Sequence, residues 1–411
     1  MQVRTQVILK EPTDGHRPTP RMPRGAGQFC VALAVTLAVV LPIPARATPP
    51  AWPLWDQYAQ HFVDGQGRVI DRSQQDRTTS EGQAYAMFFA VVGNDRARFA
   101  SLLNWTEANL ASGDLTLHLP AWSWGKAPDG SWKVLDPSPA TDADLWMAYA
   151  LIEAGRLWND QRYEKLGRVL AERIAKEEVV HVPGLGTTLQ PGPVGFHPDA
   201  KTWLLNPSYL PPPVLARLAQ AMPQGPWTKV QASLGEMLRH GSGDGFAMDW
   251  VAAGGGGVHS SVNPTQFANG DKSAVPIGSY DAVRVYLWLG ISDPLTPGVR
   301  ALLASVPGMA AYLKSNLAPP LAVDSTGKAL SPDGPVGFSA AVVPYLDTLN
   351  HKSSASAQMD RLFATRDPAN GLYGRGAAYY DQNLALFSTG WADRHYRFDR
   401  DGRLKVKWNA K

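Results

Sequence analysis

The sequence lacks several features on which small exported proteins or nucleic-acid-binding proteins depend. Its single cysteine, Cys30, excludes an intramolecular disulfide, so a packed core must stabilise the fold. An excess of charge of one sign is missing too. The chain has 39 basic and 36 acidic side chains, of which residues 1–47 hold six and two. The other 364 residues carry 33 basic and 34 acidic groups, a balance that predicts no basic surface for nucleic acid or acidic lipid.

Motifs for metals and cofactors are absent as well. The chain has no HExxH motif and no Cys/His cluster at the spacing of a metal site. The stretch "DSTGKA" (324–329) lacks both the upstream glycine and the Ser or Thr that follows the lysine of a phosphate-binding loop. We therefore expect no metal and no organic cofactor.

One apolar run resembles a targeting segment. It extends from residue 29 to 43, follows Arg21 and Arg24, and ends at Ala45-Arg46-Ala47, a small-x-small cleavage pattern. At about 15 residues it is shorter than the roughly 18–20 that a membrane span requires. These features predict a cleaved signal peptide over residues 1–47 and no stable membrane anchor after cleavage.

The mature chain is expected to begin near Thr48 and to form one domain, residues 48–411. No obvious linker or low-complexity segment follows Pro53, and the domain is long enough to bury a large core. The segment before Arg21 is long for the basic part of a leader, so Met22 is an alternative start.

Helical patterns dominate this domain and come in pairs. Apolar residues recur at helical spacing in twelve segments. The pairs are 54–63 with 80–92, 95–110 with 143–158, 160–177 with 209–222, 225–239 with 279–290, 297–315 with 335–348, and 353–364 with 379–391. Strand patterns are confined to 64–70 and the C-terminal 396–408. Six helical hairpins joined by long Gly/Pro-rich loops predict an all-α toroid with a few short strands, in which the loops gather functional residues at one end.

Three carboxylates stand where a loop leads into a strongly apolar helix: Glu81, Asp142 and Asp281. Each alone is explained by pairing with the positive end of the helix dipole, and Asp281 also by an ion pair with Arg284 one turn later. Burial, however, raises the pKa of a carboxyl group, which is the property that a general acid needs near neutral pH. Because helix starts gather at one rim of a toroid, the three together indicate a functional site.

The neighbouring Asp144 has a simpler interpretation. Thr141 would cap the first turn of its helix, and Asp144 three residues later would complete a capping box. We expect Asp142 to contact the substrate and Asp144 to cap the helix.

Tryptophan is abundant, with 14 residues, many of which lie beside Gly, Pro or Ser. Roughly half are expected to pack in the core, but flat apolar rings in loops also stack on the faces of pyranoses. Two carboxyl groups that face such a sugar-binding groove are the minimum required for glycoside hydrolysis.

At these residues the sequence resembles a known family. The stretch "ATDADLWMAYALIEAGRLW" (140–158) is similar to the signature of glycoside hydrolase family 8. Further blocks resemble the family in the same order: "SEGQAYAM" (80–87), "NPSYL" (206–210), "SYDAVRVYLW" (279–288) and "YYDQNLALF" (379–387). The resemblance extends from Trp55 to Trp391 and is strongest to the periplasmic endoglucanases associated with bacterial cellulose synthase.

The resemblance implies an (α/α)6 barrel that hydrolyses β-1,4-glucan with inversion at the anomeric carbon. Carried over by motif, Glu81 matches the general acid and Asp281 matches the general base that activates water. Asp142 matches the residue that grips the sugar at the cleavage point, although some descriptions of the family make this position the nucleophile. Because inversion requires a water between acid and base, we expect the carboxyl groups of Glu81 and Asp281 to lie about 6.5–9.5 Å apart.

The candidates for substrate binding are aromatic or cationic side chains of the same blocks and loops: Trp122, Trp124, Trp132, Tyr209, Tyr280, Arg284 and Tyr380. The three tryptophans are expected to be sugar platforms, and Tyr209 and Tyr380 to line the site with hydroxyl groups. Tyr280 and Arg284 either orient and tune Asp281 or serve only packing and an ion pair.

The expected partner is a β-1,4-glucan (cellulose) chain in the periplasm or outside the cell, and the cellulose synthase machinery is a further candidate. No nucleic acid is expected. The resemblance also covers chitosanases, lichenases and xylanases. A chitosan groove would present extra acidic residues, and two loops hold six candidates: Asp114, Asp129, Asp136, Asp244, Asp249 and Asp271. A polysaccharide-binding accessory with incidental activity is the alternative from another functional class.

Overall fold

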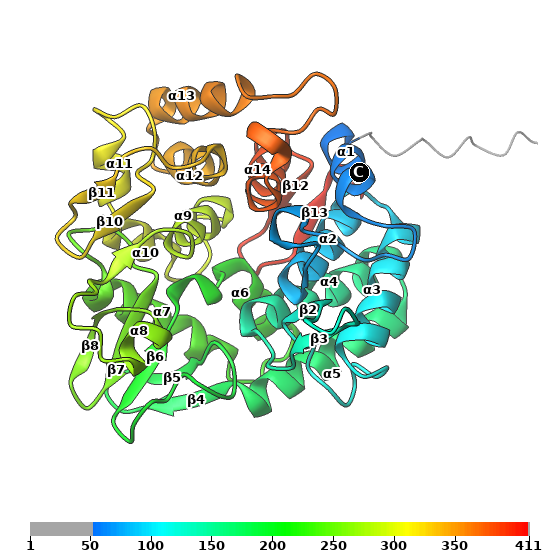
Figure 1. Ribbon diagram of the computed structural model, residues 1–411, viewed down its shortest axis with the longest axis horizontal. Coiled ribbons are helices and arrows are strands. Elements are labelled where there is room, and N and C mark those ends of the chain that lie inside the picture. Colours follow the sequence, from blue (N-terminus) through cyan, green and yellow to red (C-terminus); the bar gives the residue numbers. More distant parts are fainter. Residues whose placement is uncertain (1–51, 410–411) are drawn as a thin grey trace, which may run out of the picture. The chain divides into compact units, whose positions relative to one another are not determined.

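The computed structural model describes residues 52–409 (Figure 1). The predicted signal peptide and the alternative start at Met22 lie outside the described residues. Within residues 52–409, no helix is both long enough and apolar enough to cross a bilayer. The α-helices of this part are α1 (Pro53–Phe62), α2 (Ser80–Val92), α3 (Arg96–Leu110), α4 (Thr141–Trp158), α5 (Gln161–Glu177), α6 (Pro212–Ala221), α7 (Trp227–Gly241), α8 (Pro264–Ala268), α9 (Ala282–Ile291), α10 (Val299–Ser305), α11 (Gly308–Tyr312), α12 (Val336–Thr348), α13 (Lys352–Phe363) and α14 (Tyr379–Ala392).

Short strands of two to five residues occupy the connections and the C-terminus. They are β1 (Thr78–Thr79), β2 (Ser123–Lys126), β3 (Trp132–Asp136), β4 (Val179–Val182), β5 (Gly186–Leu189), β6 (Thr202–Leu205), β7 (Trp250–Gly254), β8 (Gly257–Ser261), β9 (Ile277–Gly278), β10 (Ala322–Asp324), β11 (Ala329–Ser331), β12 (Tyr396–Phe398) and β13 (Leu404–Val406). Their pairing is antiparallel, in the orders β1-β2-β3, β4-β5, β6-β7-β8, β9-β10-β11 and β12-β13.

The helices alternate between an inner and an outer position. Six of them are buried on most sides: α2, α4, α6, α9, α12 and α14. The helices between them bury one face, as in α5, which packs on α4 through Gly167, Leu170, Ala171 and Ile174. In Figure 1 the pairs follow one another around the ring in chain order, from α1 and α2 in blue through α7 in green to α14 in orange-red. The (α/α)6 barrel predicted from the sequence is confirmed.

Aromatic side chains fill the centre of the ring. Phe387 of α14 lies 5.0–5.3 Å, between ring centroids, from Tyr85 and Phe88 of α2, Trp146 of α4 and Trp288 of α9. Edge-to-face, tilted and stacked pairs of this kind add to the stabilisation from burial alone. Part of the tryptophan content therefore serves the core, as expected.

Two glycines allow α4 and α5 to pack unusually closely. A Cβ at Gly155 of α4 would lie 2.5 Å from the Glu164 nitrogen, and one at Gly167 of α5 would lie 2.9 Å from the Ala148 carbonyl oxygen. No larger side chain fits at either position without moving backbone. This close packing fixes the position of α4, whose first turn carries Asp142.

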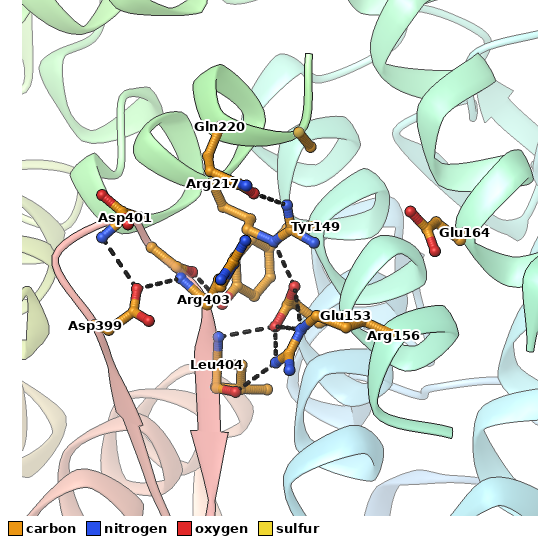
Figure 2. Close-up of polar contacts among 12 residues, drawn as sticks. Tyr149, Glu153, Arg156, Glu164, Arg217, Gln220, Asp399, Asp401, Arg403 and Leu404 are labelled. Carbon is orange, nitrogen blue, oxygen red and sulfur yellow. Dashed lines mark hydrogen bonds and ion pairs between the residues drawn. The ribbon is translucent and has the colours of Figure 1, made fainter. Parts of the chain in front are cut away.

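A buried carboxylate connects the inner helices to the C-terminal hairpin (Figure 2). Glu153 of α4 is fully buried and accepts hydrogen bonds from Arg217 Nε of α6 at 2.5 Å and from the Leu404 N–H of β13 at 2.8 Å. Arg156 of α4 also binds Glu153, and its guanidinium donates to the Leu404 carbonyl oxygen at 2.6 Å. The last strand of the chain is thereby attached to two inner helices.

Two sequence expectations differ from the structure. The segment 297–315 forms two short helices, α10 and α11, because Pro307 cannot continue a helix. The segment 64–70 forms a turn closed by a single bridge between Val63 and Val69 instead of a pair of strands. The expected C-terminal strands are confirmed as the antiparallel pair β12 and β13.

Candidate active site

Three inner helices bring the predicted catalytic carboxylates together. Glu81 is the second residue of α2, Asp142 is the second residue of α4, and Asp281 immediately precedes α9. All three bind the guanidinium of Arg284, on the first turn of α9. Its Nη2 lies 2.9 Å from Asp281 Oδ1 and 3.4 Å from Asp142 Oδ2, and its Nη1 binds Glu81 Oε2. Carboxylates that are far apart in the sequence thus meet around one cation.

One cation among three carboxylates leaves negative charge in a largely buried place. The side chains of Arg284 and Asp142 are 6% exposed, against 19% for Glu81 and 29% for Asp281. Burial raises the pKa of Glu81 to about 7. The negative charges of Asp142 and Asp281 raise this pKa further, whereas the positive charge of Arg284 lowers it. Burial also raises the pKa of Asp142, again against Arg284. A carboxyl group like Glu81 can hold and release a proton near neutral pH.

Glu81 is available to the site because another residue caps its helix. Thr79 Oγ1 accepts a hydrogen bond from the Gly82 N–H at 3.1 Å, which satisfies one of the free donors at the start of α2. The hydroxyl of Tyr85, one turn later, lies 3.5 Å from Glu81 Oε2 and donates toward it. The Glu81 carboxylate therefore points at Arg284 and Tyr85 instead of its own backbone.

The second aspartate of α4 does not cap the helix. Thr141 lies inside the helix, and its hydroxyl donates to the Gln190 carbonyl oxygen at 2.6 Å. Asp144 is fully buried, and no N–H or O–H group within residues 52–409 donates to its carboxylate oxygens. The capping box predicted for Thr141 and Asp144 is therefore wrong, because Thr141 binds a neighbouring loop instead. Glu178 is a buried neighbour of Asp144, and burial raises the pKa of both carboxyl groups well above the usual range.

The block 206–210 contributes two contacts to Arg284, of which the sequence indicated one. The ring centroid of Tyr209 lies 5.7 Å from the guanidinium carbon, a cation–π distance. Ser208 Oγ accepts a hydrogen bond from Arg284 Nη2 at 3.0 Å, which the sequence did not predict. Asn206 Oδ1 holds Ser208 by accepting from its N–H and its hydroxyl. In the sequence, this Asn-x-Ser pattern indicates only a local turn.

Tyr280 and Tyr380 form an aromatic edge beside the carboxylates. Their ring centroids are 5.7 Å apart, and the Tyr380 hydroxyl donates to the Tyr280 carbonyl oxygen at 2.5 Å. Tyr280 is 51% exposed, whereas Tyr380 is half-buried. Burial raises the pKa of Tyr380, and the charges of Arg284, Glu81 and Asp281 act on the same hydroxyl. The structure thus places both tyrosines next to the predicted catalytic groups.

The three tryptophans expected to bind sugar fall into two places. Trp122 precedes β2, and its carbonyl oxygen accepts a hydrogen bond from the Ser80 N–H at 3.0 Å, at the start of α2. Trp124 of β2 and Trp132 of β3 stack on each other with ring centroids 5.3 Å apart. The guanidinium of Arg68 lies 4.5 and 4.7 Å from these two rings. Protein atoms therefore cover part of both rings, whereas Trp132 is still 44% exposed.

The site offers carboxyl groups, hydroxyl groups and aromatic rings. Within the described part of the chain, no three His, Cys, Asp or Glu side chains are grouped so that they could hold a metal ion. Carboxyl groups on a common cation, one with a pKa of about 7, can donate a proton to a leaving group and accept one from water. This is acid–base chemistry suited to hydrolysis.

Comparison with known proteins decides the family. Residues 29–394 match the family model for glycosyl hydrolases family 8. The chain belongs to glycosyl hydrolases family 8. This membership confirms the resemblance seen in the sequence blocks, and it makes the protein a glycoside hydrolase.

Relatives of this family 8 enzyme cover nearly all of its length. It is 41% identical over 386 residues to the endoglucanase of Xanthomonas axonopodis pv. citri (strain 306), which covers 94% of this chain and 96% of that protein. It is 42% identical over 361 residues to the endoglucanase of Escherichia coli (strain K12), covering 87% and 91%. Among solved structures, the endo-1,4-D-glucanase from Vibrio fischeri ES114 is 38% identical and superimposes with a TM-score of 0.80, covering 88% of this chain and 100% of that one.

Proposed function

We propose that this endoglucanase hydrolyses internal β-1,4-glucosidic bonds of cellulose by an inverting acid–base mechanism. The observation that carries the proposal is the meeting of Glu81, Asp142 and Asp281 on Arg284. Its relatives are named endoglucanases, and a solved relative is named an endo-1,4-D-glucanase, which supports a β-1,4-glucan as substrate.

In the proposed reaction, each carboxyl group has one task. Glu81 gives its proton to the glycosidic oxygen as the bond to the anomeric carbon breaks. Asp281 takes a proton from a water molecule, whose oxygen forms the new bond to the anomeric carbon from the opposite face. Asp142 binds the sugar at the cleavage point and favours its distorted shape. The separation of about 6.5–9.5 Å between the acid and the base stays a prediction.

Arg284 and Ser208 support these roles. Before the substrate binds, the guanidinium holds the three carboxylates in place, and Ser208 Oγ fixes one of its nitrogens. A fixed cation lowers the cost of burying carboxylates side by side. Trp122, Tyr209, Tyr280 and Tyr380 are proposed to contact the sugars, and Trp124 and Trp132 to do so with the ring surface that Arg68 leaves free.

Several loop aspartates are already engaged, which favours glucan over chitosan. Asp114, Asp129 and Asp271 each accept hydrogen bonds from the N–H and the hydroxyl of the residue two positions later, within their own exposed turns. A groove for glucosamine would instead require free carboxylates that face the substrate. Chitosanase, lichenase and xylanase activity are the other outcomes of the test below.

The decisive experiment measures reducing-end release from carboxymethylcellulose, with chitosan, xylan and lichenan in parallel. The variant Glu81→Gln is expected to lower kcat by about 10²–10⁴-fold, the usual contribution of general-acid catalysis. Glu164→Gln on the outer helix α5 is the matched control and should retain activity. Release from chitosan alone would overturn the substrate. No release from any polymer would favour the polysaccharide-binding accessory.

The stereochemistry is tested separately. Proton NMR of the first products of cello-oligosaccharide hydrolysis should show the α-anomer, because a single displacement inverts a β-linkage. An initial β-anomer would indicate two displacements and would make Asp142 or Asp281 a nucleophile.

We further propose a periplasmic location and a role in trimming cellulose as the synthase exports it. The support is the signal-peptide pattern of residues 1–47 and the resemblance to endoglucanases associated with cellulose synthase. Fractionation of the producing bacterium, with sequencing of the mature N-terminus, tests the location. A cytoplasmic protein that retains residues 1–47 would contradict it.

A further inference from the structure

Asp249 is a buried carboxylate that the proposed mechanism does not use. It immediately precedes β7 and is 8% exposed. Its backbone N–H donates to the Ile277 carbonyl oxygen at 2.8 Å, which attaches it to β9. The chain continues from β9 directly into the residues around Asp281.

A single oxygen of Asp249 holds the chain on both sides of Asp281. Its Oδ1 accepts hydrogen bonds from the backbone N–H groups of Ser279 and Ala282, each at 2.8 Å. Ser279 is anchored a second time, because its hydroxyl donates to the Leu321 carbonyl oxygen at 2.6 Å. The short segment that carries Asp281 is thereby fixed to two other parts of the barrel.

Asp249 also binds the first N–H group of α9, next to Asp281. An aspartate that precedes a helix commonly accepts a hydrogen bond from the second or third helical N–H. Asp281 occupies this position but makes no such bond, because the N–H groups of Val283 and Arg284 donate to backbone carbonyl oxygens. The carboxylate of Asp281 is therefore free to bind Arg284 Nη2, at 2.9 Å.

We infer that Asp249 is a positioning residue for the general base: by accepting the N–H groups of Ser279 and Ala282, it holds the Asp281 carboxylate where it can take a proton from water. The inference rests on the proposed function, in which Asp281 is that base. It depends on the acceptor oxygen of Asp249 and not on its charge, so an asparagine should replace it.

The test is a comparison of kcat and KM on cello-oligosaccharides for the whole protein and its Asp249 variants. Asp249→Ala removes the acceptor and is expected to lower kcat about 10- to 100-fold, because a small displacement of a catalytic group has effects of this size. Its KM should stay within about 3-fold, since substrate contacts are kept. Asp249→Asn keeps the acceptor oxygen and should retain kcat within about 3-fold. Asp249→Leu provides a second acceptor-free variant of similar volume in case the alanine variant folds poorly.

Asp381 offers a matched control outside the catalytic cluster. It is 7% exposed, and its Oδ1 accepts a hydrogen bond from the Gly337 N–H of α12 at 3.1 Å. Asp381→Ala should lower the melting temperature, as Asp249→Ala does, but should leave kcat unchanged.

The outcomes separate the inference from the proposed function. Full kcat in Asp249→Ala and Asp249→Leu would overturn the inference, and so would an equal loss of kcat in Asp249→Asn. A raised KM with unchanged kcat would also overturn it, because Asp249 would then act in binding. Asp281→Asn is measured beside them. If that variant keeps the wild-type kcat, the proposed function itself is wrong.

Discussion

The guanidinium of Arg284 neutralises only part of the charge that surrounds it. Three carboxylates share this one cation in a place from which water is largely excluded, where electrostatic interactions are stronger than at the surface. The protonation of Glu81 is therefore set by two opposing effects. Burial and the neighbouring carboxylates favour the protonated form, whereas Arg284 favours the ionised form.

Removal of this cation should move the pH dependence of the enzyme upward. Because Arg284 lowers the pKa of Glu81, the variant Arg284→Met should raise that pKa above its present value of about 7. A general acid must be protonated, so the alkaline limb of kcat/KM should shift to higher pH. A pH–rate profile checks this, with Arg284→Lys as the charge-conserving control. An alkaline limb that stays in place in Arg284→Met would show that Glu81 is not the acid.

Some residues of the site can be predicted from the sequence because they follow a local pattern, whereas others depend on contacts between distant parts of the chain. Glu81, Asp142 and Asp281 each stand at a helix start, which can be recognised from neighbouring residues alone. Ser208 and Asp249 act through contacts across 76 and 30 residues of chain, and no local pattern encodes such pairs. The same limit explains the error at Asp144. The local sequence fits a capping box, but in the folded protein the Thr141 hydroxyl donates to the distant Gln190 carbonyl oxygen instead.

Glu153 of α4 stabilises the contact of the inner helices α4 and α6 with the last strand, β13. Its carboxylate is buried among Arg156, Arg217 and the Leu404 N–H. Glu153→Ala should destabilise the protein by about 3–5 kcal/mol, because it leaves two cations without their buried partner. Urea unfolding monitored by circular dichroism measures this loss.

The control for that measurement is an ion pair of the same type at the surface. Glu164 of α5 binds Arg168 at 2.8 Å, and both side chains are about one third exposed. Glu164→Ala should cost less than about 1 kcal/mol, because water screens the pair. Equal losses in the two variants would contradict a special role for the Glu153 cluster.

Helices could be predicted better than strands because they depend on local pattern. All six pairs were expected from apolar spacing. The segment around Pro307 was misjudged, because a proline divides α10 from α11, and the five-residue helix α8 was not expected. The strands in the loops are two to five residues long, too short for a clear alternation of polar and apolar residues. They form because their backbones pair with one another, as β6 does with β7 across a long connection.

The stability of the whole barrel should depend on pH through the buried pair Asp144 and Glu178. Burial raises the pKa of both groups in the folded state, whereas in the unfolded chain they ionise near pH 4. Their contribution to stability is therefore fully present below about pH 4 and is lost as the pH rises through the folded-state values.

An asparagine at position 144 should remove part of this loss. Its amide supplies a permanent N–H toward Glu178, so Asp144→Asn should melt about 1–2 °C above the wild type at pH 8, for each kcal/mol gained, and close to it at pH 4. Calorimetry at the two pH values checks this. Asp56→Asn, whose side chain is 62% exposed, is the control and should show no such difference. A variant that is equally destabilised at both pH values would contradict the explanation.

The C-terminal hairpin also bears on the order in which the barrel folds. Tyr149 and Glu153 of α4 bind the backbone of Gly402 and Leu404, across 253 and 251 residues of chain. Because closing a longer loop costs more conformational entropy, contacts between such distant residues form slowly. The hairpin is therefore expected to dock after the inner helices have assembled, as the last closure of the ring.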